Sequence, residues 1–257
     1  MRFGFRSNPF VGAVHRYFLL LVVAAACGGA RCTAAAQATS EGQGQIPGDV
    51  PRMETVLSGM DEAAAHFSSV TADLEYTKVT VLVNDRSTEK GKVYFEKSKK
   101  KLRVMLAFTE PSEKYVLFSN GKVSIYRPKI AEVEQYSLAD SEGLLEQFLL
   151  LGFGTSGSDL QKSYQVSLKG EETLDGEPAV HLDLVPKNPK VAARLQHIEL
   201  WLSPKSWQPL QQKFFEPSKD FLIARYRNLL HNTKIAGKTF QLPIRGKIRT
   251  VRPQNGN

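Results

Sequence analysis

The chain of 257 residues has only two cysteines, Cys27 and Cys32, and both lie within its first 36 residues. If those residues are removed as a leader, the remaining protein has no thiol for a disulfide or a nucleophile. A domain of about 210 residues buries enough apolar surface to fold without such cross-links. The fold is therefore expected to depend on a hydrophobic core alone.

Recognisable enzyme motifs are also missing. The five histidines form no HExxH or other paired metal spacing, and the sequence contains no GxGxxG and no P-loop. The run Gly154-Thr155-Ser156-Gly157 lacks the spacing of a nucleophile elbow. His181 and His197 alternate with apolar residues, as outward-facing strand histidines do. We expect a non-enzymatic protein with no metal and no cofactor, and keep a hydrolase using Ser156 or His181 as the least favoured alternative.

The excess of positive charge is small. The net charge is +8, but residues 1–36 contribute four arginines and no acidic residue, which leaves 30 basic and 26 acidic residues in the remainder. A net charge of +4 is too low to indicate nucleic-acid binding. It suits an exported protein that touches anionic membrane surfaces transiently.

No apolar run is long enough to span a bilayer as a mature helix. The longest at the N-terminus, Tyr17–Ala26, is about ten residues long and follows three arginines, which is typical of a secretory signal peptide. Cleavage after Ala36 would make residues 1–36 the signal peptide and residues 37–50 a flexible linker. The alternatives are a bacterial lipobox that makes Cys27 the lipidated first residue, anchoring the protein to a membrane, and an uncleaved N-terminal anchor.

Two helices are expected. The first begins at Pro51 and runs for about five turns, and its apolar side could serve as a lid through Met53, Val56, Leu57 and Met60. The second covers residues 141–153 and is apolar nearly all round, so it is buried or meets a second apolar surface. The glycines that follow it predict a flexible loop.

The rest of the chain alternates with a period of two, which predicts strands. Asn120-Gly121, between two alternating runs, is a strong signal for a tight hairpin. A long strand is expected to continue through Val83, and two short strands, near 239–242 and 247–251, to close the chain. The pattern indicates a mainly β (α+β) protein with an antiparallel sheet of roughly ten or eleven strands.

The apolar strand faces can be interpreted in two ways. They either fill a large core or line a curved, partly filled sheet that the helices cover as a lid, and periodicity does not separate the two. For the second interpretation, strand alternation selects these residues as the lining of an apolar cavity: Leu74, Val81, Val93, Phe95, Leu102, Val104, Val116, Phe118, Ile125, Phe148, Leu151, Leu182, Leu200 and Phe214.

The order of motifs resembles the periplasmic lipoprotein-carrier family of LolA and its lipid-anchored relative LolB. The resemblance covers roughly residues 52–250 and is carried by an N-terminal helix and then by Gly91–Phe95, Glu110-Pro111, Val116–Lys122, Tyr126, Pro128, Val133–Tyr136, Ile198–Leu202 and Pro209-Leu210. It implies an incomplete antiparallel β-barrel over residues 51–252, with helices closing an apolar cavity. It also implies binding of the acyl chains of lipoproteins and their transport across the periplasm.

The function expected from these features is that of a monomeric periplasmic carrier of acylated lipoproteins or lipids, which moves lipoproteins toward the outer membrane. Its partners would be an inner-membrane release complex and an outer-membrane acceptor, with no nucleic acid. The alternative is an envelope-stress sensing or binding module of the same fold. Such a module would hold a stable partner protein and transfer nothing to a membrane.

Overall fold

The computed structural model describes residues 52–98, 101–137 and 151–252. The ordered elements in these ranges are α2 (Met53–Ala65), β1 (Ser69–Thr80), β2 (Asp85–Ser98), β3 (Lys101–Glu110), β4 (Lys114–Ser119), β5 (Lys122–Arg127), β6 (Glu132–Ser137), α4 (Gly157–Ser163), β7 (Tyr164–Leu174), β8 (Glu177–Pro186), α5 (Pro189–Ala192), β9 (His197–Leu202), β10 (Pro209–Phe215), β11 (Phe221–His231) and β12 (Arg249–Val251).

The described strands form one twelve-stranded sheet in the order β12-β6-β5-β4-β3-β2-β1-β11-β10-β9-β8-β7. Because β12 and β7 are its two edges, the sheet is open and does not close into a barrel. Every neighbouring pair is antiparallel except β12 and β6, which run parallel. The prediction of a mainly β protein built on an unclosed antiparallel sheet is confirmed. The described strands depart from it in number, twelve instead of ten or eleven, and in the parallel pairing of β12 with β6.

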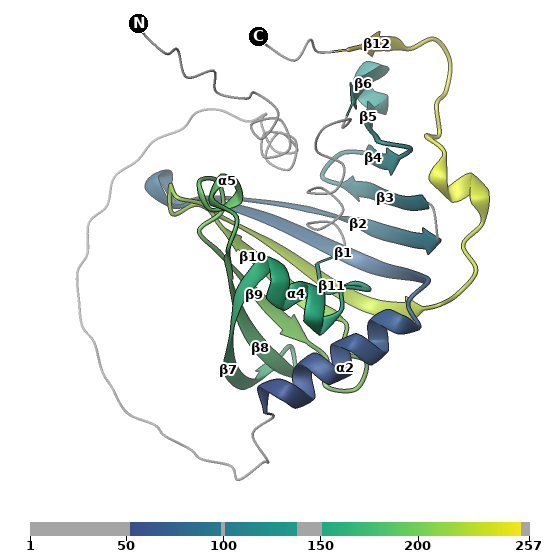
Figure 1. The fold of residues 1–257 in the computed structure, drawn as a ribbon. Coiled ribbons are helices and arrows are strands. Elements are labelled where there is room, and N and C mark those ends of the chain that lie inside the picture. The colour runs from purple at the N-terminus through teal and green to yellow at the C-terminus, as the bar shows by residue number, and fades with distance from the viewer. Residues whose placement is uncertain (1–51, 99–100, 138–150, 253–257) are drawn as a thin grey trace, which may run out of the picture.

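The sheet is strongly curved, and the helices lie on its concave side (Figure 1). The segment that begins at Leu151 and continues into α4 packs on this concave face, and α2 crosses one end of it next to α4. After β11 the chain crosses to the other side of β3, where Phe240 lies over the guanidinium of Arg103, and it ends beside β6. The two faces of the sheet are therefore covered by different segments.

Hairpin turns follow the residue types of the sequence. Asn120 and Gly121, between β4 and β5, both have positive φ angles of 52° and 66°, as a type I′ turn requires. Asp175 and Gly176 do the same between β7 and β8, with φ angles of 53° and 86°. These turns fix the strand registers and with them the choice of buried face.

The first strand is shorter than expected. β1 ends at Thr80, and Val81–Val83 form a 3₁₀ turn at the tip of the β1–β2 hairpin, closed by Asn84 in the left-handed region. Val81 is 45% exposed, so its predicted place in the cavity lining is wrong. The alternating valines predicted a longer strand. The strand ends earlier because the last residue of β1 that pairs with β11 is Val79 and the last that pairs with β2 is Thr80.

The helices also differ from expectation. The first helix, α2, starts at Met53 and has 13 residues, so it is shorter than five turns, because the chain leaves it at His66 to enter β1. Most of the second expected helix, with Phe148, lies outside the described residues, and Leu151–Phe153 form a turn. The glycine-rich stretch after it was expected to be a loop, but its last glycine, Gly157, is the first residue of helix α4. Ser156 caps this helix by accepting a 3.0 Å hydrogen bond from the backbone N of Asp159.

Near the C-terminus, the prediction of a strand at 239–242 is wrong. Gly237–Phe240 form a 3₁₀ turn that buries Phe240, and the final strand is limited to Arg249–Val251. Across the ranges that the structure describes, none of the helices is long and apolar enough to cross a membrane.

Candidate functional site

The concave face of the sheet is apolar and carries most of the predicted lining. Directly opposed residues of neighbouring strands point to the same side, and the pairs Ala72–Val93, Phe95–Val104 and Leu182–Leu200 all face inward. The residues predicted for the lining that lie together in this buried cluster are Leu74, Val93, Phe95, Val104, Val116, Phe118, Ile125, Leu151, Leu182, Leu200 and Phe214, with Leu102 partly buried beside them.

A short segment fills the middle of this face. Phe153 has no exposed surface, and its ring lies 5.1 Å from the ring of Phe95 and 4.9 Å from that of Tyr226, measured between centroids. The backbone oxygen of Leu151 accepts a 2.5 Å hydrogen bond from the amide of Gln212. We call Leu151–Gly154 the plug, because in this state it occupies the space that a ligand on the concave face would need.

The plug is held by a buried polar network. The Gln212 side chain that donates to Leu151 accepts a 2.8 Å hydrogen bond from the hydroxyl of Tyr226. Burial raises the pKa of Tyr226 well above its usual value, so the phenol stays protonated and keeps donating. Polar groups that are satisfied inside an apolar face fix one arrangement, and leaving them unsatisfied is costly.

Helix α2, which carries the residues predicted to serve as a lid, lies across one end of the concave face. Val56 and Met60 are buried in the interior cluster, Met53 packs against its edge, and Leu57 is partly buried. At Leu57 the backbone approaches Gly157 of α4 so closely that a Cβ there would lie 2.5 Å from the Leu57 oxygen. A 3.2 Å hydrogen bond from the backbone N of Ser158 to Asp61 also joins the two helices.

One end of the concave face is charged, and its residues were not among those predicted for the site. Lys114, only 6% exposed, lies opposite Phe108 on the inward side and donates to both carboxylate oxygens of Glu89 at 2.5 and 2.6 Å. Burial raises the pKa of Glu89 and lowers that of Lys114, because both charged forms lose hydration. The inward positions of Val116 and Phe118 would have placed Lys114 on this face, since it shares their alternation.

A second ion pair continues this charged end. Arg127 donates to Glu134 at 2.7 Å, and the hydroxyl of Tyr136 donates to the other oxygen of the same carboxylate at 2.6 Å. Glu134 lies opposite the buried Ile125, so it points inward. The interior therefore has an apolar part beneath the plug and a polar end near β4–β6.

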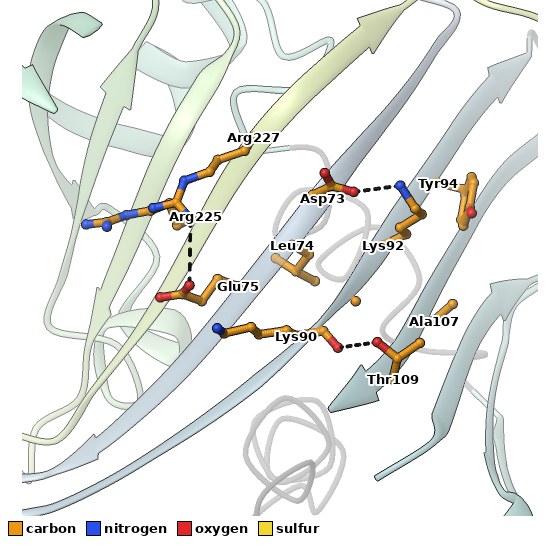
Figure 2. Close-up of a pocket in the computed structure, with 11 residues that line it drawn as sticks. Asp73, Leu74, Glu75, Lys90, Lys92, Tyr94, Ala107, Thr109, Arg225 and Arg227 are labelled. Carbon is orange, nitrogen blue, oxygen red and sulfur yellow. Dashed lines mark hydrogen bonds and ion pairs between the residues drawn. The ribbon is translucent and has the colours of Figure 1, made fainter. Parts of the chain in front are cut away.

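The outer face of the sheet carries a shallow polar groove of about 440 Å³ over β1, β2, β3 and β11 (Figure 2). Its charged side chains are mostly paired with one another: Lys92 donates to Asp73 at 2.6 Å, and Arg227 lies 3.9 Å from Glu75. The hydrogen bonds from Lys92 and Asn228 lower the pKa of Asp73. These groups satisfy each other across strands and make the groove a solvated surface.

The residues considered for catalysis are not assembled. Ser156 is the N-cap of α4 on the concave side, whereas His181 lies on the outer face, stacked on Trp201 with 4.3 Å between ring centroids and 2.6 Å from Glu172. Within the described ranges, no three His, Cys, Asp or Glu side chains are grouped as metal ligands would be. The hydrolase alternative thus has no nucleophile and base in contact.

Comparison with known proteins now decides the family. The sequence model of the family described as outer membrane lipoprotein carrier protein LolA matches residues 65–243. The chain belongs to the LolA family. The match begins at the last residue of α2 and includes the plug and eleven of the twelve described strands, so the concave face is part of the LolA-like region.

The chain also has low sequence identity to one archaeal protein and to several proteins of known structure. An uncharacterised protein of Methanocaldococcus jannaschii, MJ0687, is 23% identical over 189 residues, which are 73% of this chain and 50% of that protein. The MucA/MucB complex structure of Pseudomonas aeruginosa (19% identity, 77% of this chain, 64% of that chain) has a TM-score of 0.46. Mycobacterium tuberculosis lipoprotein LppX (10% identity, 71% and 98%) has a TM-score of 0.45. This LolA-family chain spans about half the length of the archaeal relative and less than two thirds of MucB.

Proposed function

We propose that this LolA-family protein is a non-enzymatic carrier that binds the acyl chains of lipoproteins on its concave face and moves them through the periplasm toward the outer membrane. The observation that supports this most is the plug: a short segment, not a strand of the sheet, covers the apolar face, with Phe153 against Phe95 and Tyr226. A segment held by few hydrogen bonds can leave without disrupting the sheet.

The energetics of acyl transfer fit a carrier. Each methylene transferred from a membrane into water costs about 0.8 kcal/mol, so acyl chains leave a bilayer slowly without help. A carrier needs only an apolar surface of comparable affinity and a cover that exchanges with the ligand. In this proposal the plug and α2 form that cover, and the adaptable side chains of Met53 and Met60 accommodate different chains.

The N-terminal region completes the proposal. Residues 1–36 would be a signal peptide, residues 37–50 a linker and residues 51–252 the carrier domain, with lipidation of Cys27 as the alternative that would tether the protein to a membrane. Residues 1–51 lie outside the described residues. The intact mass of the protein purified from its native envelope distinguishes a start at Gln37 from a lipidated Cys27.

An acyl-transfer assay tests the carrier function directly. The protein is mixed with donor vesicles containing a fluorescent N-palmitoyl lipopeptide, separated from them, and then added to acceptor vesicles. We expect a soluble protein–lipopeptide complex that delivers the probe to the acceptor. Failure to take up the probe would contradict the proposal, and uptake without delivery would favour the sensing module.

The β1–β2 hairpin tip is proposed as the contact with the membrane surface. Leu82 and Val83 are 93% and 68% exposed, and Asp220 accepts a 2.9 Å hydrogen bond from the backbone N of Val81 and so fixes the turn. Exposed apolar side chains beside a cation such as Arg86 suit the interface of an anionic bilayer. The mostly charged and polar residues that line the groove of Figure 2 offer no comparable apolar surface.

We expect Leu82→Asp to weaken binding to vesicles that contain anionic lipid about tenfold or more, because burying a leucine contributes about 1.5–3 kcal/mol. Stability should be unchanged, since the side chain is almost fully exposed. The matched control is Leu230→Asp, the same substitution at a leucine that is 57% exposed and lies at the opposite end of the sheet. Equal vesicle binding by both variants, measured by co-sedimentation, would rule out the tip as the contact.

A further inference from the structure

One segment of the chain carries all of the positive charge that the protein has in excess beyond residue 36. Residues 232–257, which follow β11, contain no acidic residue and six basic ones: Lys234, Lys238, Arg245, Lys247, Arg249 and Arg252. Without these six, the 30 basic and 26 acidic residues that follow residue 36 become 24 and 26, a net charge of −2. The rest of the protein is therefore slightly acidic, and its basic character has a single location.

The structure describes this segment as far as residue 252, and we call residues 232–252 the C-terminal strap. The strap leaves the end of β11 and runs along the outside of the sheet to β6 (Figure 1). The ring of Phe240, which is only 6% exposed, lies 4.4 Å from the guanidinium carbon of Arg103. The backbone N of Arg249 donates to the backbone oxygen of Ala131 at 2.9 Å. These contacts make the strap part of the folded surface.

The basic side chains of the strap are exposed, and most have no acidic neighbour. Among the residues that the structure describes, only Glu132 lies within ion-pair distance of any of the six, through Arg249. In the groove of Figure 2, by contrast, charged side chains neutralise one another, as Lys92 and Asp73 do. The other five cations of the strap keep their full charge at the surface, where it attracts anions.

Two exposed isoleucines lie beside these cations. Ile244, which is 45% exposed, directly precedes Arg245 in the strap. Ile130, which is 58% exposed, ends the short turn between β5 and β6 and precedes Ala131, the residue that accepts the hydrogen bond from Arg249. Exposed apolar side chains among lysines and arginines are typical of surfaces that enter the headgroup region of a bilayer. An electrostatic contact with an acidic polypeptide does not need them.

We propose that the C-terminal strap docks the protein on membranes that contain anionic phospholipid. The lipid phosphates pair with the unpaired cations of the strap, and Ile130 and Ile244 enter the headgroup region. Each lysine or arginine near such a surface strengthens binding about fivefold. Because the strap lies on the outside of the sheet, docking leaves the concave face uncovered. This contact is separate from that of the β1–β2 hairpin tip and does not depend on acyl transport.

The test is co-sedimentation of the protein, purified with its native N-terminus, with phosphatidylcholine vesicles that contain or lack phosphatidylglycerol. Both kinds of vesicle have the same acyl chains, so a difference in binding reports headgroup charge and not uptake into the interior. A Leu82→Asp background minimises the contribution of the hairpin tip. We expect binding only to the anionic vesicles, and about 25-fold weaker binding by Arg245→Gln/Lys247→Gln.

The matched control is Lys90→Gln/Lys205→Gln, which neutralises two exposed lysines outside the strap and should bind as its parent does. The fold is expected to be retained in the strap variant, because Arg245 makes its 3.4 Å hydrogen bond to the hydroxyl of Tyr126 through the backbone N. Equal vesicle binding by the strap variant and the control would overturn the proposal. So would the absence of binding to anionic vesicles in the Leu82→Asp background.

A further variant separates a lipid surface from an acidic polypeptide. Ile244→Gln keeps every charge, and we expect it to weaken vesicle binding about fivefold while leaving the binding of polyglutamate unchanged. If polyglutamate binds as tightly as the anionic vesicles and Ile244→Gln alters neither, the strap recognises acidic polypeptides and the lipid proposal is overturned.

Discussion

Replacing Phe153 with alanine is expected to destabilise the protein and, at the same time, to strengthen acyl binding. Phe153 is fully buried between Phe95 and Tyr226, and removing a phenylalanine from such a site costs about 3–5 kcal/mol. In a carrier, the same ring is what an acyl chain must displace. Its removal lowers the cost of opening, so we expect roughly tenfold tighter binding of a palmitoyl probe.

The two effects are measured together by thermal unfolding with and without the palmitoyl probe. A ligand that binds only the folded state raises the melting temperature as its concentration rises above the Kd. We expect the probe to restore much of the stability that Phe153→Ala loses. Phe240→Ala, which truncates a buried phenylalanine packed on Arg103 outside the concave face, should be destabilised without such rescue. A Phe153→Ala protein that no acyl ligand stabilises would identify the interior as a filled core.

Lys114→Met is expected to be the most damaging change at the charged end of the interior. It leaves the carboxylate of Glu89 buried without the ammonium group that donates to both its oxygens, and breaking such a pair costs about 3–5 kcal/mol. Methionine keeps most of the side-chain volume, so the loss reports the unpaired charge. Urea unfolding at pH 7 measures it, and adding Glu89→Gln should recover most of the lost stability.

The pH dependence of this variant has a defined sign. Burial already raises the pKa of Glu89 in the native protein, and without Lys114 it rises further. Between the unfolded and the folded pKa, the folded state then binds more protons than the unfolded state, so stability falls as the pH rises. Lys114→Met should therefore regain stability as the pH is lowered through that range. A variant as stable as the parent at pH 7 would show that Glu89 reaches water and that the interior end is open.

The sequence by itself determined the local structure and the inward side of most strands. Asn120-Gly121 and Asp175-Gly176 form tight turns because those residue types tolerate positive φ, and alternation then assigned Val93, Val104 and Leu182 to the interior. Helical spacing gave α2 its inward side, with Val56 and Met60 buried. These features depend on neighbours within a few residues, which is why a single chain reveals them.

Only the tertiary structure decided the rest. Alternation could not show that β1 ends at Thr80, because the end of this strand depends on how far β2 and β11 extend beside it. The pairing of Lys114 with Glu89, and the contact of Gly59 with Trp207, join residues 25 and 148 positions apart. Such contacts are set by the curvature of the whole sheet and by strand order, which no local pattern encodes.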